Sequence, residues 1–443
     1  MKRFLLLLAV VSSAVCPQLH AQATSSPPQE PSQPPETGAA LTLSEAEAIA
    51  LKNNPQITIG RLRALAAHQY VREARALLMP NAYLSLTAVD ANPGSRLTAG
   101  LLNNPTLYPR AAGGVSVTQL VTDFGRTANL VSSSEYGAKS EDQNAAATRA
   151  DILLVVDQAF YNSLETKALV TVAEETVHAR QTLVDKVQAL MNAKLKSEID
   201  LSFSNVDLAR GKLLLLEAQN NYQTSLAALS AILGYPDEQN FQLVEETQSV
   251  NQPAPEVAPL IQQALEQRPE IKALQLAVES AEKFGRAEHD LWRPTVNALG
   301  VVGQAPVRDN HIESWYGAVG VNINIPVFNG FLYGARAKAA DLESEADRQK
   351  LLDARNNLAR DVRNAWQDSR RAFERLSVTR QFREQASLAL DLAQSRYNLG
   401  LGSIVEFTQA ELQKTEADIQ DTDAKYQYRL TQIVLAFTIA APK

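Results

Sequence analysis

Apolar and polar residues follow two different periods along this chain, which divide it into strand and helix segments. Residues 319–325 alternate strictly, with valine or isoleucine on one face and glycine or asparagine on the other. This period of two predicts a half-buried strand. Leu153, Val156, Phe160 and Leu164 recur every three or four positions, which predicts a helix with a narrow apolar stripe. Because the other faces of this helix are polar, it needs partner helices and exposes much of its surface to water.

Proline and glycine mark where each kind of segment lies. Residues 126–233 and 331–441 contain no proline and are rich in Ala, Leu, Gln, Glu, Lys and Arg. Such segments favour long helices, and a helix of this length, roughly 97 Å at about 1.5 Å per residue, is typical of a coiled coil. Eleven of the 19 glycines fall in residues 90–125 and 300–334. Strands and turns are expected there, with strands at about 81–90, 113–122, 294–303 and 315–325.

The chain also repeats itself. Asn54-Pro55 is echoed by Arg268-Pro269, and Pro80 by Pro294, in each case 214 residues later. Beyond the first strand pair the offset falls, and residues 156–160 match residues 362–366 at an offset of 206. One constant offset on each side of a single length change indicates a duplication. It predicts a first structural repeat over residues 41–234, an inter-repeat linker over 235–258 and a second repeat over 259–440.

Each repeat has the same expected order. A short helix and a second helix come first, then two strands, then two long helices joined by a tight turn near 192–199 or 398–403. Pro80 and Pro294 end the second helix, because the residue before a proline is disfavoured in the α conformation. Gly125 and Gly330 follow the strand pairs, where glycine accommodates the unusual dihedral angles of a strand-to-helix turn.

The N-terminus is typical of an exported protein. Lys2 and Arg3 precede an apolar run at residues 4–11, and a small-residue cleavage site follows. The expected signal peptide is residues 1–21, with cleavage possible after residue 23, and residues 22–40 are a proline-rich linker. Lipidation at Cys16 stays open, although the branched Val15 before it is a poor match to a lipidation signal.

Composition and charge exclude several functions. A net charge of -7 gives no electrostatic basis for binding nucleic acid. The one cysteine and five scattered histidines do not form a local metal-binding motif, and no serine-hydrolase, phosphate-loop or HExxH motif occurs. We therefore expect no enzyme activity, no metal and no cofactor. No later run of 18 apolar residues suggests a transmembrane helix, but alternating strands leave a β-barrel open.

Four strands cannot close a membrane barrel, because the smallest such barrels have about eight. Three copies would supply twelve, and an open sheet edge would be unsatisfied in lipid. The predicted fold class is therefore α+β and mostly α. Long coiled-coil helices would form a periplasmic α-barrel, and four strands per chain would complete a 12-stranded transmembrane β-barrel in a homotrimer.

This chain resembles the TolC-type outer membrane efflux protein family over about residues 41–440. The resemblance rests on the duplicated order, on the two proline positions of each repeat, on residues 123–125 and 325–330 after the strands, and on residues 397–400 and 404–406 at the second turn. It implies a passive exit duct of the outer membrane that extends into the periplasm, in a tripartite efflux or type I secretion system. The implied partners are a periplasmic membrane fusion (adaptor) protein, an inner-membrane transporter of RND or ABC type and outer membrane lipid.

The resemblance also implies roles for individual residues. Glu406 matches one of two acidic constriction residues, and the second falls on Gln409. Asp200 and Tyr397 match a closing polar network, whose arginine would fall on Gly402, so that this contact is expected to be missing. The contacts with the adaptor are expected at the helical turns (Asn192, Leu195, Ser197, Gly400, Leu401, Ser403), and the barrel-to-helix junctions at Pro80, Gly125, Pro294 and Gly330.

Two plainer interpretations stay open. Glu406 and Asp200 can instead be solvated acidic residues at helix starts, where negative charge is favourable. The whole chain can instead be a periplasmic coiled-coil adaptor or structural protein, whose strands form a small soluble domain.

Overall fold

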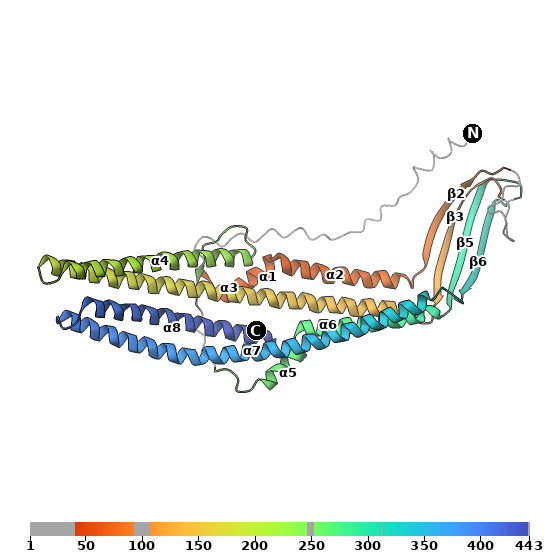
Figure 1. Cartoon of the computed structure of the whole chain (residues 1–443). Coiled ribbons are helices and arrows are strands. Elements are labelled where there is room, and N and C mark those ends of the chain that lie inside the picture. Colours follow the sequence, from red (N-terminus) through yellow and green to blue (C-terminus); the bar gives the residue numbers. More distant parts are fainter. Residues whose placement is uncertain (1–39, 93–106, 246–251, 312, 442–443) are drawn as a thin grey trace. The chain divides into compact units, whose positions relative to one another are not determined.

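The computed structural model describes residues 40–92, 107–245, 252–311 and 313–441. The expected signal peptide and residues 22–39 of the proline-rich linker lie outside the described residues. The described chain runs twice through the same succession of elements (Figure 1). The first series is β1 (Ala40–Leu41), α1 (Leu43–Asn53), α2 (Pro55–Ala76), β2 (Asn81–Val89), β3 (Arg110–Thr122), α3 (Arg126–Asn192) and α4 (Glu198–Ile232). The second is β4 (Gln242–Leu243), α5 (Ala258–Gln267), α6 (Pro269–His289), the 3-10 turn η2 (Asp290–Trp292), β5 (Thr295–Arg308), β6 (Trp315–Asn324), α7 (Leu332–Asn398) and α8 (Ile404–Thr438).

The two series match closely in length. Helices α3 and α7 have 67 residues each, and α4 and α8 have 35 each. The proline-free segments therefore form the long helices that their composition favours. The predicted duplication and the mostly helical α+β fold class are both confirmed.

One antiparallel sheet contains all four long strands, in the order β2-β3-β5-β6. The central pairing of β3 with β5 joins the two repeats, and each repeat contributes one outer strand. The register is long and nearly continuous: Asn81 lies opposite Thr118, and Thr295 opposite Asn324. Strands β2 and β6 are the edges of this sheet (Figure 1).

Two strands are longer than expected. β3 begins at Arg110 rather than 113, and β5 continues to Arg308 rather than 303. The longer β5 contains Pro306, which cannot donate a hydrogen bond to a sheet. In the structure Gly113 pairs with Gln304 and Ala111 with Val307, so two residues of β5 oppose one of β3. Pro306 lies in this bulge, where a strand tolerates proline.

Both second helices end before their prolines. α2 ends at Ala76 and is followed by a hydrogen-bonded turn, while α6 ends at His289 and continues as the 3-10 turn η2. Pro80 and Pro294 directly precede the strands. The tightened last turn follows from the steric restriction on the residue before each proline.

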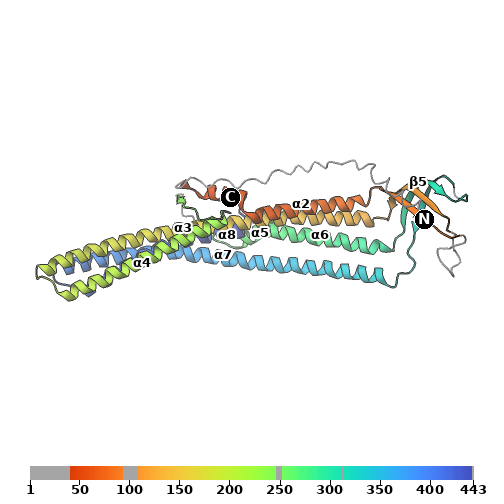
Figure 2. The same cartoon turned by 90° about the horizontal axis from the view of Figure 1, so that it is seen from above.

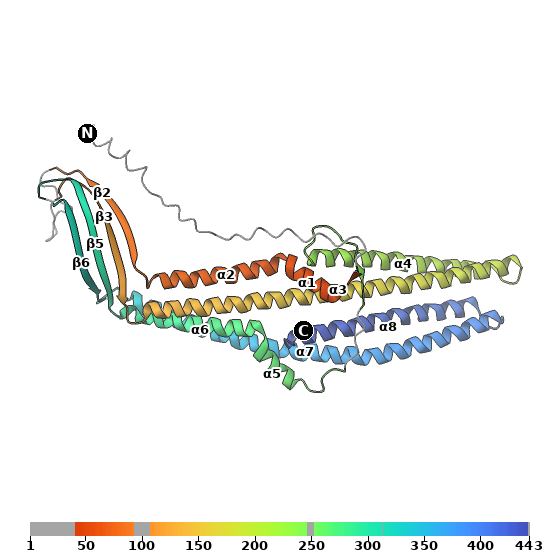
Figure 3. The same ribbon diagram turned by 180° about the vertical axis from the view of Figure 1, so that it is seen from behind.

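The helices pack in two groups of four that share α3 and α7. Towards the sheet the contacts run α2–α3–α6–α7, and away from it they run α4–α3–α8–α7 (Figures 2 and 3). A buried core where the groups meet includes Val156, Phe160 and Leu164 of the predicted stripe, together with Leu229 of α4 and Tyr426 of α8. Helix α3 is therefore in contact with helices on several sides, as its length and polarity require.

Candidate functional site

The turn that joins α3 to α4 and the turn that joins α7 to α8 have the same geometry. Together they form the helical tip, residues 192–200 and 397–406. At the first turn Leu195 N donates to Leu190 O at 2.9 Å, and at the second Leu401 N donates to Arg396 O at 2.9 Å. This six-residue closure is a Schellman motif, which needs one residue with positive φ. Gly400 takes that position in the second turn with φ +73°, and Lys194 takes it in the first with φ +58°.

A serine caps the helix that follows each turn. Ser197 Oγ accepts from Asp200 N at 3.3 Å, and Ser403 Oγ accepts from Glu406 N at 3.2 Å. Asp200 returns the contact, because its Oδ2 accepts from Ser197 N at 3.1 Å and from Ser197 Oγ at 2.9 Å. Asp200 thus stabilises the start of α4 through a capping box.

An apolar cluster joins the two turns inside one chain. Leu183 and Val187 of α3 pack with Tyr397 of α7 and with Ile404 and Phe407 of α8. Tyr397 and Phe407 stack with ring centroids 5.7 Å apart. Tyr397, one of the residues expected at the gate, is therefore held in place by packing between the repeats.

Tyr397 lies at the centre of this cluster. Its ring carries the Lys196 ammonium 3.9 Å from the centroid, and only 2% of the residue is exposed. Among the described residues its hydroxyl has no hydrogen-bond partner. Burial, and secondly the charge of Asp200, raise the pKa of Tyr397. Within one chain Asp200 thus acts on Tyr397 through its charge, while its carboxylate accepts hydrogen bonds from Ser197.

Glu406 has a partner that sequence reasoning missed. Its Oε1 lies 3.1 Å from Arg396 Nε, and Arg396 Nη2 donates to Leu401 O at 3.3 Å. Gly402 makes room for this pair, because a Cβ on it would lie 3.1 Å from Glu406 Oε2 and 3.3 Å from Arg396 Cβ. A glycine at position 402 thus provides space for the ion pair. It is not required by the backbone conformation, because the φ of Gly402 is not positive. Gln409 is exposed one turn further along α8.

The residues expected to contact the adaptor also lie at the tip. Asn192, Leu195, Ser197, Gly400, Leu401 and Ser403 are all exposed. Leu195 and Leu401 are 70% and 69% exposed, so each turn presents a leucine to its surroundings. On the flank of the tip, Lys186 Nζ donates to Asn398 Oδ1 at 2.7 Å and links α3 to the end of α7.

The strand-to-helix junctions contain strained backbone. Gly125 and Gly330 have φ of +104° and +62°, and the neighbouring Phe124 and Phe331 also have positive φ. At the first junction the side chain of Asp123 caps helix α3, because its Oδ2 accepts a hydrogen bond from Thr127 N at 2.7 Å.

Arg293 ties the second repeat to the first junction. Its Nη1 donates to Phe124 O at 2.7 Å, and its Nε lies 2.9 Å from Asp290 Oδ1. Asn129 Nδ2 donates to the other oxygen of Asp290 at 3.0 Å. Proline and glycine marked the junctions in the sequence, but no local signal identified this polar contact across 160 or more residues.

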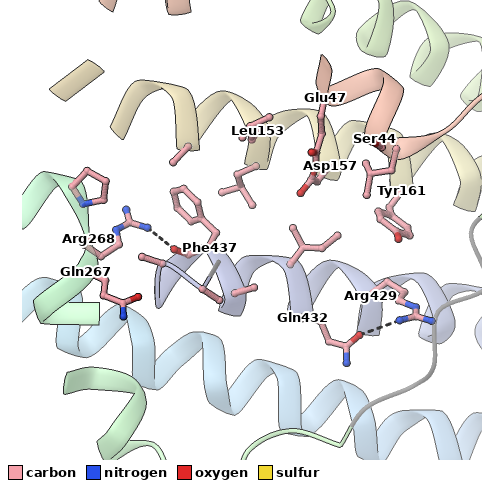
Figure 4. A pocket seen from close by; sticks show the side chains of 18 residues that line it. Ser44, Glu47, Leu153, Asp157, Tyr161, Gln267, Arg268, Arg429, Gln432 and Phe437 are labelled. Atoms are coloured by element: carbon pink, nitrogen blue, oxygen red, sulfur yellow. Dashed lines mark hydrogen bonds between the residues drawn. The ribbon is translucent and has the colours of Figure 1, made fainter. Parts of the chain in front are cut away.

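A cavity of about 970 Å³ lies between α3 and the end of α8 (Figure 4). Leu153 and Tyr161 line it from α3, and Phe437 from α8. Arg268 closes one side, with Nη1 donating to Phe437 O at 2.8 Å and its guanidinium 4.3 Å from the Phe437 ring. Its walls are mostly apolar.

Neither metal ligands nor membrane-spanning helices stand out in the described ranges. No three His, Cys, Asp or Glu side chains among the described residues are arranged to hold a metal ion. None of the described helices is both long and apolar enough to span a membrane.

Comparison with known proteins shows the relationship directly. The model of the family described as outer membrane efflux protein matches residues 48–235 and 260–441, one segment in each repeat. The outer membrane protein TolC of Salmonella enteritidis is 20% identical over 418 residues, which cover 90% of this chain and 83% of TolC.

Two solved structures have the same fold. CusC superposes with a TM-score of 0.78 at 19% identity, covering 90% of this chain and 91% of CusC. The outer membrane protein VceC of Vibrio cholerae superposes with a TM-score of 0.75 at 18% identity, covering 90% and 95%. The family and these structural neighbours are channels rather than enzymes. Because the family model spans both repeats, this chain belongs to the outer membrane efflux protein family and is a protein of the cell outer membrane that extends into the periplasm.

Proposed function

We propose that three copies of this chain assemble into a passive exit duct of a tripartite efflux or type I secretion system. Each copy would contribute four strands to a 12-stranded barrel and four helices to each level of a periplasmic tube. The observation that carries this proposal is that the sheet and both groups of helices end in elements with an unpaired side. These outer elements are β2, α2 and α4 on one side of the chain, and β6 and α7 on the other.

The sheet gives the first pair of edges. Within the described residues β2 and β6 each have one strand neighbour, so one side of each lacks sheet hydrogen bonds. Their side chains are exposed as well, including Leu84 and Leu86 on β2 and Val319 and Val321 on β6. An open apolar edge of this kind favours pairing with another copy, and closure into a barrel removes it.

The helices towards the tip give the second pair of edges. In the order α4–α3–α8–α7, the outer helices are α4 and α7. Exposed apolar residues on α4 repeat at heptad positions, namely Ile199, Val206 and Leu213 with Phe203 between them. Exposed residues on α7 do the same, namely Val378, Leu392 and Leu399 with Phe382. Such stripes are typical of coiled-coil contacts, so α4 of one copy would pack on α7 of the next.

The helices towards the sheet repeat the pattern. Here the outer helices are α2 and α7, and both expose apolar residues: Leu62 and Tyr70 on α2, and Leu342 and Leu352 on α7. Because the two edges of each chain differ, one copy would contact the next head to tail. Such a contact closes into a ring when the rotation between copies allows it. A ring of three gives twelve strands, within the range of known membrane barrels.

The helical tip would then surround the periplasmic entrance. We assign Glu406, Gln409, Asp200, Tyr397 and Gly402 to the gate, and the exposed turn residues to contact with a periplasmic adaptor. Three copies place three Glu406–Arg396 pairs around the axis. Because the two charges of each pair oppose one another, this ring would be only weakly selective between cations and anions.

The assembly is tested by the mass of the protein extracted in detergent from the outer-membrane fraction. Light scattering, with the detergent subtracted, should give three times the chain mass, and single-channel conductance in planar bilayers should follow. A monomeric mass would contradict the duct and favour a periplasmic coiled-coil adaptor or structural protein.

The helix edges are tested by two variants that place a charge in the proposed stripes, Phe203→Asp and Phe382→Asp. Each should lower the temperature at which the trimer dissociates in detergent. Gln394→Asp is the matched control, because Gln394 is exposed on α7 but follows Leu392 by two residues and so lies on another face of the helix. An equal effect of all three variants would contradict this contact.

A further inference from the structure

Two clusters of charged residues lie between the helical hairpins α3–α4 and α7–α8, of which one is buried and the other is partly exposed. The tip-proximal cluster consists of Arg180, Asp207 and Glu411, and the tip-distal cluster of Arg375, Asp423 and Glu165. Each contains one arginine and two carboxyl groups. Neither lies among the expected gate residues, and neither forms part of the proposed contacts between copies.

The tip-proximal cluster is almost sealed from water. Arg180 Nε of α3 lies 3.1 Å from Asp207 Oδ2 of α4, and Arg180 Nη1 donates to Asp207 O at 2.9 Å. Gly211 leaves space for this arginine, because a Cβ on it would lie 3.2 Å from Arg180 Cδ. Glu411 reaches Asp207 from α8 and is only 8% exposed.

One carboxyl oxygen in this cluster has no hydrogen-bond donor. Among the described residues Glu411 Oε2 has no hydrogen-bond partner, whereas Asp207 Oδ2 lies beside the Arg180 guanidinium. Two facing carboxylates repel one another, but one proton shared between them supplies the missing donor. The geometry therefore favours a protonated Glu411 when α8 is packed against α3 and α4.

The tip-distal cluster repeats this arrangement with the roles of the hairpins exchanged. Here the ion pair belongs to the second hairpin, with Arg375 Nη2 of α7 2.7 Å from Asp423 Oδ2 of α8. The additional carboxyl group is Glu165 of α3, which is in hydrogen-bond contact with Asp423. Each hairpin thus holds an internal ion pair and extends one extra carboxyl group to the ion pair of the other.

The electrostatics agree at both places. Burial first, and then the charge of Asp207, raise the pKa of Glu411 to about 7, against the opposing effect of Arg180. Burial, the hydrogen bond to Asp423 and its charge raise the pKa of Glu165 to about 7, against the opposing effect of Arg375. The hydroxyl of Tyr426 also faces Glu165, and it donates a hydrogen bond to Glu245 Oε2 at 3.1 Å.

We propose that the contact between α3 and α8 is a proton-dependent switch, in which Glu411 and Glu165 each bind one proton when the hairpins are closed and lose it when they separate. Loss of the proton leaves each carboxylate beside another carboxylate, and separation of the helices then gives it access to water. Low pH favours the closed arrangement, and rising pH through neutrality favours separation.

This inference rests on the proposed duct, because separation of the hairpins would widen its entrance. The experiment reads helix separation rather than conduction, so that the two can fail independently. Cysteines at the exposed positions Asp185 of α3 and Gln413 of α8 carry spin labels, in a full-length chain with Cys16→Ser. Labelled chains are assembled with an excess of unlabelled chains, so that distances within one chain dominate.

We expect the distance between the labels to lengthen as pH rises from about 5.5 to 8.5, with a midpoint near 7. Glu411→Gln and Glu165→Gln keep the shape of the protonated side chain, and together they should hold the short distance throughout. Glu175→Gln is the matched control, because Glu175 is exposed on α3, and it should titrate like the natural chain.

A distance that does not change with pH in the natural chain overturns the proposal. So does a pH response that survives in the double Gln variant with the same midpoint. A distance change without conductance in planar bilayers would contradict the duct and support the switch.

Discussion

The strongest test of the helical tip is Tyr397→Phe, because the two accounts of this hydroxyl predict opposite signs. In the structure the hydroxyl is buried and accepts and donates no hydrogen bond among the described residues. A buried polar group without a partner costs about 1–3 kcal/mol. The phenylalanine keeps both ring contacts, the stack with Phe407 at 5.7 Å and the Lys196 ammonium at 3.9 Å. We therefore expect Tyr397→Phe to stabilise the tip by about 1 kcal/mol.

A closing hydrogen bond to Asp200 would give the opposite result. Its removal would cost about 0.5–1.5 kcal/mol, and more where it leaves Asp200 unpaired. Hydrogen–deuterium exchange of the amides in residues 390–410 measures the local opening free energy directly. Tyr397→Ala is the positive control, because it removes the ring and should cost about 3–5 kcal/mol. A loss of protection of about 1 kcal/mol or more in Tyr397→Phe would refute the assignment of an unpartnered hydroxyl.

Three further predictions concern the gate, a buried carboxyl group and the sheet. Glu406→Ala should shift single-channel selectivity towards anions and Arg396→Ala towards cations, since each leaves one charge of the 3.1 Å pair unopposed; equal shifts in one direction would count against the pair. Glu411→Gln should leave stability unchanged at low pH and raise it at pH 8 by about 3 kcal/mol, at about 1.36 kcal/mol per pKa unit. The sign follows because the pKa rises from 4.5 to about 7 on folding, so the natural chain loses stability as pH rises through this range; urea titrations at pH 5 and pH 8 measure it. Gly303→Ala should impair assembly in outer-membrane fractions, because its Cβ would lie 2.4 Å from the Tyr316 ring and 2.6 Å from the backbone oxygen of Gly113; Gly320→Ala, whose Cβ would meet no atom within 4 Å, should assemble normally.

Several features of this protein are determined by short stretches of sequence. The period of two in residues 319–325, the proline-free segments and the repeated offsets identified strands, long helices and duplication without any structure. These signals are local, because a strand, a helix or a turn depends on residues that are near one another in the chain. Gly400 is such a case, since a Schellman turn needs positive φ and glycine provides it.

Lys194 shows where local signals end. It has the same left-handed backbone as Gly400, although lysine gives no hint of it. The turn closes there because the packing of α3 on α4 overdetermines the backbone, and this packing outweighs the residue's own preference. Pro306 is similar, because only the pairing of β5 with β3 reveals the bulge that accommodates it.

Contacts between distant residues were decided by the tertiary structure alone. Glu406 was recognisable as an acidic residue at a helix start, but its partner Arg396 lies across a turn in another helix. Glu411 and Asp207 come from different repeats, and nothing near either residue in sequence predicts that one carboxyl group will be buried against the other. The physical reason is that desolvation and Coulomb interaction depend on distance and burial in space, which only the packing of the two repeats sets.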